Sequence, residues 1–110
     1  MGKIIESPVK RWPGKVTLHD PLTFPMVFAF EDALAEIREQ GTDSARGFYA
    51  ALGGIFPCVE TWGLSGNGFP ENVTLENFPA VPRASSHKLI AWLIREITDL
   101  FMESEEVPNE

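Results

Sequence analysis

Side chains that bind metals or perform nucleophilic chemistry are scarce in this chain of 110 residues. There is one cysteine, Cys58, and the two histidines, His19 and His87, lie far apart in the sequence. A single thiol forms neither an internal disulfide nor a multi-thiolate metal site, and no HxxxH or HExxH pattern pairs two imidazoles. Cys58 lies among apolar residues, which favours a buried, unreactive thiol. We therefore expect no metal site and no catalytic residue.

Long hydrophobic runs are also missing. No uncharged apolar stretch approaches the roughly 20 residues that span a bilayer; the stretch 24–30, for example, is far shorter and contains Pro25. The N-terminal residues lack the apolar segment of a signal peptide, so we expect a cytoplasmic protein. The glycines in 64–68 lack the GxxxxGK[ST] pattern of a phosphate-binding loop. The sequence therefore predicts no cofactor and no enzyme activity.

Basic residues are few outside the N-terminal segment. Residues 1–15 contain four basic side chains and one carboxylate, whereas residues 16–110 contain five basic and fifteen acidic ones, and the net charge of the chain is −7. Nucleic acids and anionic membranes bind basic surfaces, so neither is an expected partner. An acidic surface favours solubility or, alternatively, contacts with a basic partner.

The remaining composition is that of one folded domain. Hydrophobic residues make up 44% of the chain, and the aromatic side chains comprise eight Phe, three Trp and one Tyr. This apolar content is sufficient for a single core. We predict one domain over 1–103, followed by an acidic C-terminal tail over 104–110.

Strand patterns come first in the chain. Residues 3–20 contain alternating and β-branched segments on either side of Trp12-Pro13-Gly14, a turn sequence, and this arrangement predicts an N-terminal β-hairpin. A helix follows over 25–40, because its apolar residues recur at helical spacing and Gly41 is a natural end.

The elements that we predict after residue 41 are helices. We expect a helix over 44–52 capped by Asp43 or Thr42, then a break at Gly53-Gly54 and a short helix reaching Trp62, with a single kinked helix as the alternative. Residues 63–85 form a long ordered connection, and Ser85 or Ser86 caps a last helix that runs to about Met102. The connection includes 74–77, which can form one helical turn capped by Thr74. It also holds four apolar residues expected on the core: Phe69, Leu75, Phe78 and Val81. The predicted fold is therefore α+β and mostly α, a short hairpin followed by three to four helices.

Two regions are candidate protein-binding surfaces. Trp12 lies in a turn beside Arg11, and tryptophan and arginine are enriched at binding hot spots, so we expect the indole to be partly exposed. The last helix has an apolar stripe close to half its circumference, wider than one core contact requires. We expect self-association through this stripe, or its use as a client site, with Ile90, Trp92 and Ile94 contributing.

Three groups of segments together resemble small proteins of tailed bacteriophages and prophages that are encoded beside the major tail protein and the tape measure protein. The segments are RWPGKVTL at 11–18 with DPLT at 20–23 and EDAL at 31–34, VETWGL at 59–64 with NFP at 77–79, and LIAWLIREI at 89–97 with VPN at 107–109. The resemblance spans nearly the whole chain, but its motifs are structural and no functional residue carries over from the family.

The resemblance implies a tail assembly chaperone. Such proteins lack catalytic residues, are thought to coat the tape measure protein during tail assembly in the host cytoplasm, and are absent from the finished particle. The first alternative is a structural tail or neck subunit, such as a tail-completion or connector protein. The second is a small cytoplasmic regulator that binds another protein.

Overall fold

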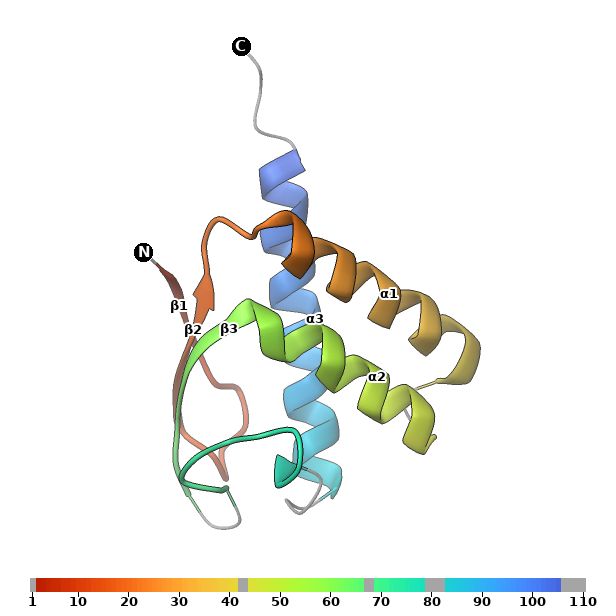
Figure 1. The fold of residues 1–110 in the computed structure, drawn as a ribbon. Helices are drawn as coiled ribbons and strands as arrows, with labels where there is room; N and C mark the ends of the chain where they lie inside the picture. Colours follow the sequence, from red (N-terminus) through yellow and green to blue (C-terminus); the bar gives the residue numbers. More distant parts are fainter. Residues whose placement is uncertain (1, 42–43, 67–68, 79–82, 106–110) are drawn as a thin grey trace.

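The structure, a computed structural model, describes residues 2–41, 44–66, 69–78 and 83–105. The elements are β1 (Gly2–Glu6), β2 (Gly14–His19), α1 (Phe24–Gln40), α2 (Ala45–Ile55), the 3-10 helix η1 (Phe56–Cys58), β3 (Val59–Leu64) and α3 (Arg83–Glu105). The strands form one antiparallel sheet in the order β1-β2-β3. The helices α1 and α2 lie side by side and extend away from the sheet, and α3 runs along the middle of the molecule (Figure 1).

The predicted N-terminal hairpin is present. Ile5 lies opposite Val16 in the register of β1 and β2, so both side chains reach the buried face of the sheet. In the connecting turn, the backbone N–H of Trp12 donates to the Val9 carbonyl at 3.1 Å. Gly14 has a φ of +134° and lies against the backbone of Gly63, so the turn requires a residue without a side chain at this position.

The third strand, β3, contradicts the predicted fold. We expected a hairpin followed by helices alone, with a short helix reaching Trp62. Instead, α2 continues through both glycines to Ile55, η1 follows, and the chain then enters β3, which pairs with β2. Pro57 explains the change, because proline has no N–H to extend the α-helix and tolerates the first turn of a 3-10 helix. The last helix therefore follows a strand and a connection, and the overall class is α+β.

α1 begins and ends close to the predicted positions, and α2 begins close to its predicted start. α1 follows Thr23, whose backbone is extended, and the N–H of Gly41 donates to the Ile37 carbonyl at its end. The cap of α2 is Ser44, whose side chain accepts a hydrogen bond from the Gly47 N–H at 3.0 Å. Thr42 and Asp43, the caps that we expected, lie outside the described residues.

Aromatic rings attach the long connection to the core. Phe78 is fully buried, and its ring contacts Phe48 of α2, Phe56 of η1 and Trp62 of β3. Phe69 packs against Trp12 and Trp62. The expectation for Phe69 and Phe78 is thus confirmed. It is wrong for Leu75, which is exposed at the predicted turn capped by Thr74, and Val81 lies outside the described residues.

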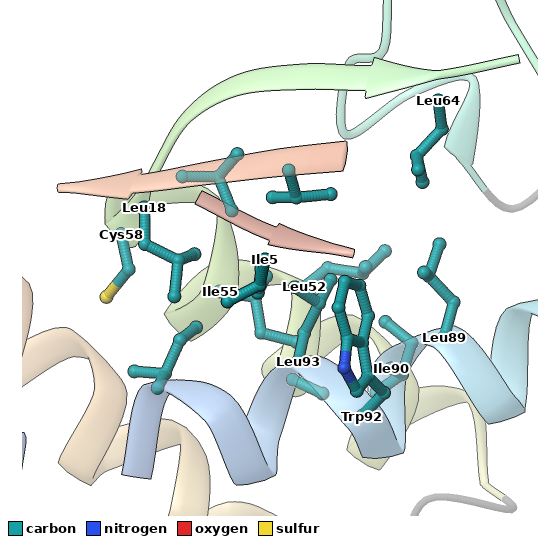
Figure 2. Close-up of a cluster of buried hydrophobic side chains, with 14 of the residues drawn as sticks. Ile5, Leu18, Leu52, Ile55, Cys58, Leu64, Leu89, Ile90, Trp92 and Leu93 are labelled. Carbon is teal, nitrogen blue, oxygen red and sulfur yellow. The ribbon is translucent and has the colours of Figure 1, made fainter. Parts of the chain in front are cut away.

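The core lies between the sheet and the helices. Side chains of α3 and of the strands meet between them, and residues of α2 complete the same cluster (Figure 2). The fully buried members include Leu18, Leu52, Ile55, Leu89, Leu93 and Ile97. α3 begins at Arg83, before the expected cap, and extends to Glu105, so the predicted tail is helical over 104–105 and lies outside the described residues from 106 onward.

Two adjacent glycines in α2 give a test of the α1–α2 packing. A Cβ on Gly54 would collide with the Ala33 Cβ and crowd Phe30 of α1, whereas a Cβ on Gly53 would meet no atom within 4 Å. Gly54→Ala should therefore force the helices apart and lower the free energy of unfolding by about 1–3 kcal/mol. Gly53→Ala should raise it by about 0.5–1 kcal/mol, because alanine is the better helix former. Urea unfolding measures both, and changes of the same sign would contradict this packing.

Candidate functional site

Trp12 does not lie on the surface. Its exposed fraction is 0%, and its ring centroid is 5.3 Å from that of Phe69. The expected partial exposure is therefore wrong, because the turn closed by the Val9 carbonyl folds the indole onto the core. Arg11, the neighbouring residue, is exposed. Trp12 is therefore part of the hydrophobic core.

The apolar stripe of α3 is also largely buried. Ile90 and Trp92 are 2% and 8% exposed, and Ile94 is partly buried and packs against the core. The stripe is wide because α3 contacts the sheet and α2 at once, so a single helix fills two interfaces within the monomer (Figure 2). The expected exposed binding face on this helix is therefore wrong. Among the described side chains of α3, Met102 is the large apolar one that is exposed.

The largest exposed aromatic surface lies instead at the beginning of α1. Phe24 and Phe28 are 78% and 59% exposed, one helical turn apart. Their rings stack on each other, with centroids 6.0 Å apart and planes inclined by 14°. We call these two residues the phenylalanine pair. Because they stack outside the core, the pair offers a preformed apolar surface to a partner.

Carboxylates follow the phenylalanine pair along α1. This helix contains four carboxylates and one guanidinium, that of Arg38. Asp32 lies one turn after Phe28 in the same i, i+4 row, Glu31 lies beside that row, and Glu39 lies two turns further along the helix; all three are exposed. The outer face of α1 is therefore an apolar patch followed, towards the C-terminal end of the helix, by negative charge.

A shallow cleft of about 570 Å³ separates α1 from α2 on one side. Small residues of both helices, including Ala29 and Gly53, form part of its lining. Polar and aromatic residues also line it: Asp32 and Glu36 of α1, and Arg46 and Tyr49 of α2. Tyr49 is itself exposed. Since Asp32 lies one turn beyond Phe28, the cleft continues the outer surface of α1 towards α2.

The sequence contained a signal for the phenylalanine pair that we did not use. On a helical wheel, Phe24 and Phe28 fall opposite the residues that define the core face of this helix: Met26, Phe30, Ala33, Leu34 and Ile37. An aromatic pair at i and i+4 on the polar side of an amphipathic helix indicates a surface patch. We considered the core face alone, so the pair was missed.

Cys58, the single cysteine, is buried. Within the described residues, no three His, Cys, Asp or Glu side chains gather where they could hold a metal ion. Burial raises the pKa of the Cys58 thiol to about 11, so the nucleophilic thiolate is rare at neutral pH. Its S–H points to the Gly54 carbonyl, with sulfur and oxygen 3.6 Å apart. The ring of His87 stacks against Phe48.

No helix among the described residues is long and apolar enough to cross a bilayer.

No family model, curated protein or solved structure matches the chain.

The raised pKa of Cys58 predicts slow alkylation. At pH 8, a thiol with a pKa of about 11 is ionised about 100-fold less than one at the ordinary value of 9.0. Iodoacetamide should therefore modify the folded protein at least about tenfold more slowly than the urea-unfolded chain, as followed by mass spectrometry. Equal rates in the folded and unfolded states would show that the thiol is accessible and not shifted.

Proposed function

We propose that this chain is a non-enzymatic, protein-binding chaperone in phage tail assembly that coats the tape measure protein in the host cytoplasm. The observation that carries the proposal is the phenylalanine pair, an apolar patch on an acidic helix in a domain whose core is closed without it. Exposed apolar patches on soluble domains commonly mark interaction sites. The resemblance of the sequence segments supplies the class of partner.

The proposed role sets physical requirements that the chain meets. A long helical client has apolar surface to cover before the tail tube encloses it, and its binder must keep the complex soluble and be displaced later. A small patch gives affinity in the micromolar range, about −8 kcal/mol for each protomer, rather than an obligate interface. The net charge of −7 adds repulsion between complexes and so opposes aggregation.

A structural tail or neck subunit is the second candidate, and the sheet favours it. β1 and β3 are the outer strands of the sheet, and outer strands can pair with strands of a neighbouring subunit. Ile4 on β1 is 64% exposed and would lie at such a contact. This candidate predicts a protein that is retained in the particle.

Co-expression tests the chaperone proposal. The long helical protein encoded nearby should be found mainly in the soluble fraction with this chain and mainly in the pellet without it, and the two should co-elute from a sizing column. Many copies of the chain should bind each client, and purified particles should lack it. Equal solubility of the client in both cases, with no complex, would contradict the proposal. Stoichiometric chain in purified particles would favour the structural subunit instead.

A further inference from the structure

We propose that the phenylalanine pair of α1 binds an amphipathic helix whose apolar stripe is flanked by lysine or arginine. The chemistry of this partner is inferred from the surface of α1. Only its assignment to the tape measure protein depends on the proposed function. The inference thus names the kind of client segment that α1 recognises.

The spacing of the pair suits a helical ligand. Phe24 and Phe28 lie one turn apart on one face, with nearly parallel rings. A partner helix presents its apolar residues at the same i, i+3 and i+4 spacing, so its stripe can pack beside and between the two rings. Since the rings already stack on each other, binding orders few additional rotamers.

The negative charge of α1 favours a ligand helix with basic residues beside its apolar stripe. Glu31 and Asp32 are exposed within one turn after Phe28, Glu39 is exposed two turns further along, and Arg38 is the one basic residue of the helix. Lysine or arginine beside the apolar stripe of the ligand would lie opposite these carboxylates. A second copy of α1 would offer four carboxylates and one guanidinium rather than a row of cations, which makes it a poorer partner for these carboxylates.

The α1–α2 cleft extends the binding surface beyond the pair. Its small lining residues allow a ligand helix to approach the two helices closely, and Tyr49 adds an aromatic side chain on the far side. Asp32 and Glu36 supply two carboxylates from α1, against the single Arg46 of α2. The cleft is therefore suited to a long basic side chain that reaches out from the ligand helix.

Two designed peptides of about 18 residues test the inference directly. Both carry leucines at i, i+4, i+7 and i+11, flanked by lysines in one peptide and by glutamates in the other. Fluorescence anisotropy should show micromolar binding of the lysine peptide and at least about tenfold weaker binding of the glutamate peptide. High salt should weaken binding of the lysine peptide, because it screens the exposed carboxylates.

Matched variants locate the site. Phe24→Ser combined with Phe28→Ser should weaken binding of the lysine peptide at least about tenfold. Because both side chains are exposed, this variant should keep the circular dichroism spectrum and melting curve of the wild type. Ile4→Ser removes an exposed apolar side chain from the sheet and should bind the peptide like the wild type.

Several results would overturn the inference. These are no binding of the lysine peptide to the wild type, equal binding of both peptides, or wild-type binding by the double phenylalanine variant. An oligomer of the wild type that the double variant loses would show that a second copy occupies the pair. The two proposals fail separately. Peptide binding with no effect on the neighbouring long helical protein contradicts the chaperone function alone, whereas client binding that survives the double variant contradicts the site alone.

Discussion

The packing of α3 between the inner face of the sheet and α2 is the contact on which the rest of the structure depends. A three-stranded sheet with one bare apolar face has little stability, and α3 covers that face with Leu89, Leu93 and Ile97, all fully buried. The same helix contacts α2, which in turn packs closely on α1 through Gly54. Removing α3 would thus expose the sheet and leave the α1–α2 pair without its attachment to the core.

This packing also determines where a partner can bind. Because the sheet and α2 bury the wide stripe of α3, that stripe is not available to a client unless the domain opens. The exposed aromatic surface is carried by α1, the helix that extends away from the sheet in Figure 1. A binding site outside the core can be occupied and vacated without unfolding, as the proposed chaperone role requires.

Local patterns predicted the hairpin, α1 and α3, because each is an element whose periodicity or turn chemistry is visible within its own residues. β3 was missed, since Val59 and Trp62 follow a helix with similar apolar content, and only pairing with β2 distinguishes a strand there. Trp12 was misplaced because the ends of a turn are usually exposed, and the rings that cover it come from distant segments. The stripe of α3 was expected to be exposed and is instead largely buried, because the width of a stripe does not reveal how many neighbours bury it.

Hydroxyl-radical footprinting of the chain, alone and with its client, tests most directly that α1 rather than α3 is the binding surface. In the free protein, Phe24 and Phe28 should be oxidised readily, whereas Trp12 and Trp92 should be protected. With the client bound, oxidation of the phenylalanine pair should fall while that of exposed Leu75 stays unchanged. Oxidation of Trp92 in the free protein that the client then suppresses, with the phenylalanine pair unaffected, would contradict the account.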